Sequence, residues 1–192
     1  SDGIIAIQSG HTITASTAIT ADQVVVDNGG TLSIASDFDF TVSNGSGDDL
    51  TVNGTLSWTR GAIAGAGNIV INAGATMNLV GGFFKTLSPG LTNNGTINWQ
   101  DGIVSVISGN ATTNTGSINI TGSTNRTWSS PSAAFNNNGT ITHSNTEISI
   151  VNANPFNNAG TINFNAGTFT NNAVVWNNTG NLNFSGTGIL NL

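Results

Sequence analysis

Apolar and polar side chains alternate in short runs along the whole chain. In Thr96-Ile97-Asn98-Trp99 the second and fourth residues are apolar, and the first and third are polar. A period of two is typical of a β-strand with one buried side and one side facing solvent. Gly, Asn, Thr and Ser, which are poor helix formers, dominate the sequence, so we expect essentially no helix.

A glycine stands directly before, or one residue before, each run and marks a repeat. The anchoring glycines are Gly10, Gly30, Gly54, Gly74, Gly95, Gly116, Gly139, Gly160 and Gly180. Their spacing lies between 20 and 24 residues and averages about 21. Such regularity predicts a quasi-one-dimensional architecture in which each repeat contacts its neighbours.

Asparagine stands two residues before most of these glycines, at Asn28, Asn72, Asn93, Asn114, Asn137, Asn158 and Asn178. Asparagines stacked on one another form amide ladders, and asparagine tolerates the left-handed conformation of a corner. The sequence therefore predicts an all-β, right-handed parallel β-solenoid of about nine coils. The handedness follows the general rule for parallel crossovers. An antiparallel β-sandwich or meander is the alternative.

Two rows of side chains would fill the coil. The first holds Leu32, Leu56, Met77, Ile97, Ile118, Ile141, Ile162 and Leu182, and the second holds Trp58, Trp99, His143, Phe164 and Phe184. Further strands are expected at 103–107, 147–151 and 168–170. Residues 1–192 form one domain, with a longer acidic loop near 37–49. The apolar, uncapped ends predict a fragment of a longer array or a filament subunit that associates through its open coils.

Composition excludes several function classes. Three basic residues and a net charge of −6 do not suit nucleic acid, and no run of apolar residues is long enough to span a membrane. The chain has no cysteine and only 6% charged residues. Like charges stacked on successive rungs would repel, which agrees with a solenoid.

Groups suited to catalysis are few. His143 occupies the row of Trp99 and Phe164, which indicates a core position rather than a catalytic base, and we expect no enzyme and no cofactor. Four acidic residues are a weak candidate for calcium: Asp37, Asp39, Asp48 and Asp49.

Short polar side chains form two outward columns on the predicted strands. They are Thr31, Ser33, Thr55, Ser57, Thr76, Asn78, Thr96, Asn98, Ser117, Asn119, Thr140, Thr142, Thr161, Asn163, Asn181 and Asn183. This grid resembles the Thr-x-Thr faces of β-solenoid ice-binding proteins, which implies ice as a ligand. A glycan is a third ligand class, and Trp128 and Trp176 are the aromatic side chains that could stack on a sugar.

The copies of Asn-Asn-Gly-Thr-Ile-Asn, with Ser9-Gly10-His11-Thr12-Ile13-Thr14 and Asn28-Gly29-Gly30-Thr31-Leu32, resemble β-strand repeats of large secreted or surface proteins of Bacteroidetes-type bacteria. The resemblance spans nearly the whole chain and implies an extracellular or cell-surface rod with a scaffolding or adhesive role. It transfers no catalytic residue. We therefore expect a non-catalytic structural or adhesive module, with an ice-binding module as the alternative.

Overall fold

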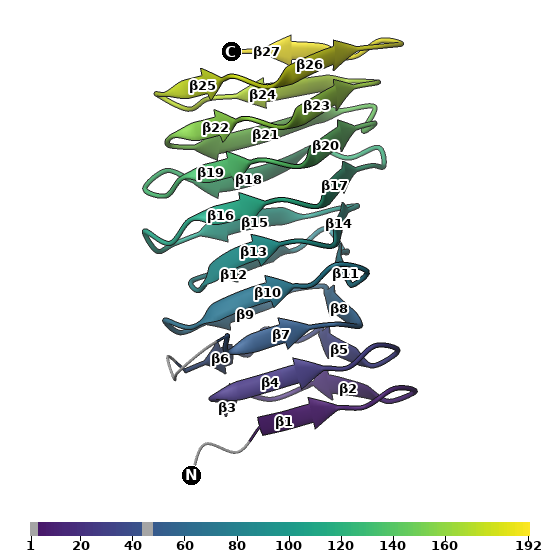
Figure 1. Cartoon of the computed structure of the whole chain (residues 1–192), viewed down its shortest axis with the longest axis vertical. Coiled ribbons are helices and arrows are strands. Elements are labelled where there is room, and N and C mark those ends of the chain that lie inside the picture. Colours follow the sequence, from purple (N-terminus) through teal and green to yellow (C-terminus); the bar gives the residue numbers. More distant parts are fainter. Residues whose placement is uncertain (1–3, 44–47) are drawn as a thin grey trace.

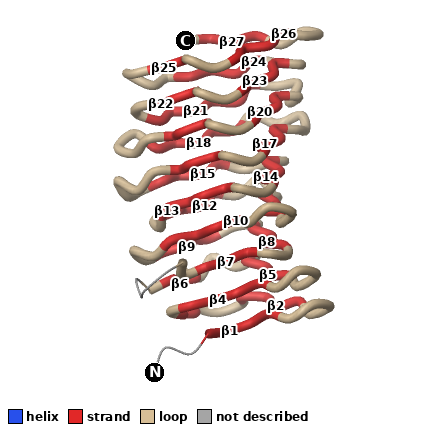
Figure 2. Tube along the Cα trace, in the orientation of Figure 1, coloured by secondary structure: helices blue, strands red, loops and turns tan. Residues whose placement is uncertain are grey.

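The computed structural model, which describes residues 4–43 and 48–192, is a parallel β-solenoid of nine turns. Each turn contributes one strand to each of three nine-stranded sheets, and every strand pairs in parallel with its counterparts in the neighbouring turns (Figure 1). The described residues contain no helix (Figure 2). The predicted solenoid is confirmed, and the antiparallel alternative is wrong.

Sheet A contains the first strand of each turn. Its members are β1 (Ile4–Ile7), β4 (Gln23–Val26), β7 (Leu50–Val52), β10 (Asn68–Ile71), β13 (Gly90–Asn93), β16 (Thr112–Asn114), β19 (Phe135–Asn137), β22 (Phe156–Asn158) and β25 (Trp176–Asn178). The strands of sheet A run left to right on the near side of Figure 1, while the chain rises from N to C. The return strands run behind them, so the coil is right-handed.

Sheet B contains the strands that follow the anchoring glycines. They are β2 (Thr12–Ala15), β5 (Thr31–Ile34), β8 (Thr55–Trp58), β11 (Thr76–Leu79), β14 (Thr96–Trp99), β17 (Ser117–Ile120), β20 (Thr140–His143), β23 (Thr161–Phe164) and β26 (Asn181–Phe184). The two predicted core rows are the inward side chains of this sheet. They are buried from β5 to β23 and become more exposed in the last turn, where Phe184 is 57% exposed.

Sheet C contains the strands of the less regular half of each repeat. They are β3 (Ile19–Ala21), β6 (Phe40–Val42), β9 (Gly61–Ala64), β12 (Phe84–Leu87), β15 (Ile103–Val106), β18 (Arg126–Ser130), β21 (Ile148–Ala153), β24 (Thr168–Asn171) and β27 (Ile189–Asn191). The three strands predicted in this half correspond to β15, β21 and β24. Strand β6 lies inside the range predicted as an acidic loop, and residues 44–47 of that range lie outside the described residues.

One continuous apolar core runs along the axis of the solenoid. It contains inward side chains of all three sheets, such as Val26, Leu56 and Val104. Burying a large apolar side chain stabilises the fold by roughly 1.5–3 kcal/mol. Nine turns at about 4.8 Å each give a rod on the order of 40 Å long, with the two termini at opposite ends (Figure 1).

The anchoring glycines are required mainly by the close approach of successive turns. A Cβ atom on Gly139 would overlap the carbonyl oxygen of Gly116, and one on Gly160 would overlap that of Gly139. Gly74 is different, because its φ of 85° is left-handed and its Cβ position is open. No described residue other than glycine has a positive φ, so the prediction of left-handed asparagines at the corners is wrong.

Candidate binding surface

The outward side of sheet B is the predicted grid of short polar side chains. Thr76 lies beside Thr55 and Thr96, and Asn78 lies beside Ser57 and Asn98, in exact register. The same register continues to the last pair, Asn181 and Asn183, beside Thr161 and Asn163. The sixteen predicted face residues therefore form two straight columns, as expected from the alternation.

The second column is partly a ladder of side-chain amides. Asn98 Nδ2 donates to Asn78 Oδ1 at 3.0 Å, and Asn119 Nδ2 donates to Asn98 Oδ1 at 3.1 Å. Asn183 Nδ2 donates to Asn163 Oδ1 at 2.9 Å. These amides use part of their hydrogen-bonding capacity on one another, so less of it faces solvent or a ligand.

The first column is mostly hydroxyl and methyl groups. Thr55, Thr76 and Thr96 are half-buried, and none of the hydrogen bonds seen in the described part of the chain ties their hydroxyls to a neighbouring side chain. Threonine favours strands because its branched side chain packs well on a pleated surface. The column is therefore a flat row of hydroxyls that can bind water or a polar ligand.

A second amide ladder lies inside the solenoid, at the corner between sheets A and B. Asn93 Nδ2 donates to Asn114 Oδ1 at 2.7 Å, and Asn114 Nδ2 donates to Asn137 Oδ1 at 2.7 Å. The series continues through Asn158 to Asn178 at 2.6 Å for each bond. The predicted ladder is confirmed for these five residues. Its position inside the core was not predicted.

Asn28 and Asn72 stand outside this internal ladder. Asn28 is exposed, and Asn72 Nδ2 donates instead to Asn53 Oδ1 at 2.8 Å. In the inward row, Ile71 lies beside Asn93 and is apolar. Asn93 Oδ1 is consequently buried without a hydrogen-bond partner.

His143 is a core residue, as its place in the aromatic row predicted. Its ring is fully buried, packs edge-on against Phe169 with centroids 5.7 Å apart, and has no hydrogen-bond partner at either nitrogen. Burial lowers the pKa of His143 to about 4. The neutral ring is therefore the stable form at neutral pH, and it is not accessible to a substrate.

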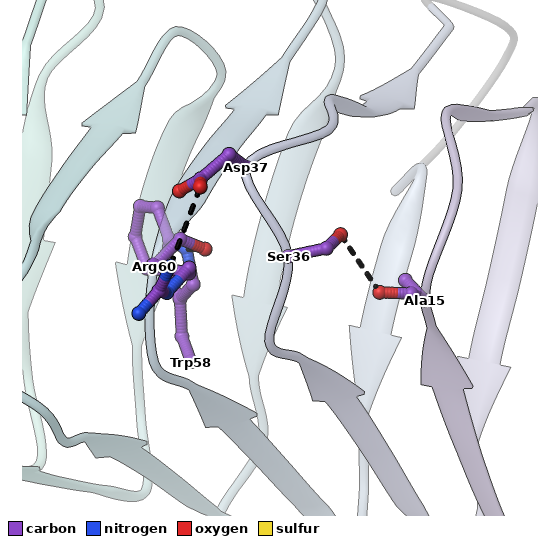
Figure 3. Close-up of polar contacts among 5 residues, drawn as sticks. All are labelled: Ala15, Ser36, Asp37, Trp58 and Arg60. Carbon is purple, nitrogen blue, oxygen red and sulfur yellow. Dashed lines mark hydrogen bonds and ion pairs between the residues drawn. The ribbon is translucent and has the colours of Figure 1, made fainter.

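The four acidic calcium candidates do not form one site. Asp37 Oδ2 lies 3.3 Å from Arg60 Nη1, while Asp49 is buried and accepts a 2.6 Å hydrogen bond from the backbone N–H of Asn68 (Figure 3 shows the first contact). Asp48 accepts from Asn68 Nδ2 at 3.4 Å. Among the described residues, no group of three or more His, Asp or Glu side chains could hold a metal ion.

The two tryptophans considered for glycan binding differ in exposure. Trp128 is 2% exposed and packs edge-on against Trp99 and Phe135, so its assignment to a surface site is wrong. It lies inside because the alternation along β18 turns the side chains of Arg126, Trp128 and Ser130 toward the core. Trp176 is half-buried and stacks on Phe156 with ring centroids 4.7 Å apart.

Two cations lie inside the corner between sheets B and C, which the sequence analysis missed. Lys85 Nζ donates to the carbonyl oxygens of Gly81 and Phe83 at 3.0 and 3.3 Å. Arg126 Nη1 donates to the carbonyl oxygen of Trp99 at 2.5 Å. The sequence did contain a signal for the inward direction of Lys85, because alternation places it on the same side of β12 as the buried Leu87.

Burial changes the acid–base properties of both cations. Burial lowers the pKa of Lys85 to about 8, against the opposing charge of Asp101. The pKa of Arg126 is also lowered by burial. Asp101 Oδ1 accepts hydrogen bonds from the Gly102 N–H at 2.7 Å and from Thr124 Oγ1 at 2.9 Å, so this corner is a structural polar network.

No protein-family model matches the chain, and neither a curated protein nor a solved structure gave a match. None of the described elements is a helix that could cross a membrane. The arrangement of the chain's own residues is therefore the basis for the function proposed below.

Proposed function

We propose that the chain is a non-catalytic structural rod of an extracellular or cell-surface protein, with an adhesive role on its long faces. The observation that carries this proposal is the continuous pairing of equivalent strands on all three sides of nine successive turns. Every internal turn is joined to both neighbours by backbone hydrogen bonds. Such an arrangement suits a spacer that holds whatever lies at its two ends apart.

The surface chemistry supports a location outside the cell. Uncharged Thr, Ser and Asn cover sheet B, and the whole chain contains 6% charged residues. The backbone is tied into ladders turn after turn, which leaves few locally open segments for a protease. A rod exposed to secreted proteases needs that property.

Proteolysis and adhesion together test the proposal. We expect purified chain to resist proteinase K, with the solenoid surviving as one large fragment, and beads coated with the chain to adhere to cell-surface or matrix material. The matched control is a chain carrying charges on sheet B, Thr55→Lys with Thr140→Lys, which should keep the resistance and change the adhesion. Rapid cleavage within many turns, or no adhesion by either form, would contradict the proposal.

Association through the outer turns is part of this proposal. Within the described part of the chain, β1 and β27 are edge strands of sheets A and C, and the outer turns expose Ile4, Ile13 and Ile189. Unpaired strand edges and apolar side chains favour pairing with another coil. Light scattering over a range of concentrations should show a molar mass that increases with concentration. A constant monomer mass would exclude this association.

Ice binding is the second candidate, and the straight hydroxyl column of sheet B favours it. Thr31, Thr55, Thr76 and Thr96 lie on successive rungs in register. Thermal hysteresis of the wild-type chain should be measured beside a Thr96→Lys, Thr161→Lys double variant. A freezing gap and faceted crystals that the variant loses would place ice binding first. Unshaped crystals and no gap would remove it.

A further inference from the structure

Exposed apolar side chains gather on one side of the rod. Between β4 and β24, the described large apolar residues that are exposed lie on sheet C or at the corners next to it: Phe38, Phe83, Phe84, Ile107 and Ile148. The outward columns of sheet B are polar throughout. Exposed apolar side chains grouped along one edge of a sheet favour an interaction site there.

One outward column of sheet C alternates between a projection and a depression. In register along successive turns lie Phe84, Ile103, Thr127 and Ile150. Phe84 is 71% exposed, so its ring stands out from the sheet. The small side chain of Thr127 lies between two isoleucines and leaves a depression of about 180 Å³.

The walls of the depression are mainly apolar. Ile103 lies on one side and Ile148 and Ile150 lie on the other, with Asn125 and Arg126 completing the lining. An apolar cavity of about 150 Å³ is large enough for a benzene ring. The depression therefore has the size and the chemistry for one phenyl side chain.

We propose that sheet C is a self-complementary interface, on which a second copy of this chain packs face to face with its rod axis reversed. A two-fold axis along the strand direction at Ile103 places turn four of one copy opposite turn six of the other. Phe84 of each copy then enters the depression over Thr127 of the other. An interface of this type uses the same patch twice and closes on itself.

Two charged side chains lie near the ends of this column. Arg60 directly precedes β9 in the third turn, and the exposed Glu147 directly precedes β21 in the seventh turn. The axis at the fifth turn exchanges the third and seventh turns, and the register of sheet C places Arg60 level with Ile150, three residues after Glu147. Packing with parallel rod axes would instead bring Phe84 against Phe84 and Arg60 against Arg60, and would leave both depressions empty.

Other contacts near the axis do not oppose this pairing. Arg60 is already held flat over the Phe83 ring, with its Cζ 3.6 Å from the ring centroid, and pairs with Asp37 (Figure 3 shows the Arg60–Asp37 contact). Asp101 lies at the corner of the fifth turn, and its side chain is turned to Gly102 and Thr124 of its own chain. Its charge is opposed by the nearby Lys85 and Arg126.

Sedimentation equilibrium of a variant that lacks the Phe84 ring tests the pairing. Phe84→Ala should weaken association about tenfold or more, whereas Thr76→Ala, on the outward side of sheet B in the same turn, should not.

Spin labels measure the orientation directly, because the chain has no native cysteine. A label on Ile103→Cys should give a short distance between copies, and a label on Thr20→Cys in the first turn should give about 40 Å, the rise of eight turns. Short distances at both sites would overturn the reversed orientation. A monomer at millimolar concentration, or a dimer that Phe84→Ala leaves intact, would overturn the interface itself.

Discussion

The side-chain amide of Asn137 donates a 2.6 Å hydrogen bond to Oδ1 of Asn158, the equivalent residue one turn further along, and both side chains are buried. The same bond repeats from Asn93 to Asn178, so each internal amide is both a donor and an acceptor. A buried polar group that loses its partner costs free energy. The ladder therefore ties the turns together only as long as it is unbroken.

Interrupting the internal ladder in the middle should cost more than shortening it at its first member. Asn137→Leu leaves Asn114 without its acceptor and Asn158 without its donor, so we expect a loss of about 2–4 kcal/mol in the free energy of unfolding. Asn93→Leu leaves only the Asn114 oxygen without its donor and removes an oxygen that already has no partner, so it should cost about half as much or less. Urea unfolding of both variants checks this, and equal losses would contradict it.

The stacked glycines should not tolerate a methyl group. In Gly139→Ala the new Cβ would overlap the carbonyl oxygen of Gly116, so the two turns must separate, and we expect a loss of about 3 kcal/mol or more. Gly82→Ala is the matched control, because its nearest non-neighbouring atom, Asp101 Oδ2, would lie at 3.5 Å. Thermal unfolding should separate the two variants clearly. A Gly139→Ala chain as stable as wild type would refute the close-approach explanation.

His143 should make the fold sensitive to acid. The pKa of His143 is about 4 in the folded chain and 6.5 when unperturbed, so the unfolded chain binds the extra proton first as the pH falls. Stability should therefore decrease between pH 6.5 and pH 4, by about 2 kcal/mol once solvent screening is allowed for.

The matched variant for this effect is His143→Phe. Phenylalanine occupies the same place one turn further along, at Phe164, and leaves no ring nitrogen without a partner. The variant should be more stable than wild type at neutral pH, and the difference should grow toward pH 4. Denaturant unfolding at several pH values measures it, and a difference independent of pH would count against a buried neutral ring.

Lys85 should make the fold more stable as the solution becomes alkaline. Its pKa of about 8 in the folded chain lies below the unperturbed value of 10.5, so the folded chain loses its proton first as the pH rises. Stability should increase between pH 8 and pH 10.5, by about 1–2 kcal/mol after solvent screening. Lys85→Met should lack this increase in the same unfolding measurements. An identical alkaline profile for both chains would show that Lys85 is not the cause.

The alternation and the glycine spacing by themselves determined the repeat, the strands of sheet B and their inward and outward sides. A strand has only two sides, so alternation by itself places Thr96 and Ile97 on opposite sides of the strand. The position of the internal Asn93 ladder and the inward direction of Lys85 and Arg126 emerged only in the structure. For Lys85 and Arg126 the reason is that alternation is weaker in the half of the repeat that forms sheet C, and its corners vary in length.

Only the tertiary structure decided which side chains of sheet C lie next to one another. Phe84, Ile103, Thr127 and Ile150 are separated by 19, 24 and 23 residues, so no fixed period aligns them. Their register depends on how much chain each corner takes up before the next strand begins. The corners are set by packing between turns, by buried cations such as Arg126 and by close backbone contacts. These are long-range contacts, which local sequence patterns do not encode.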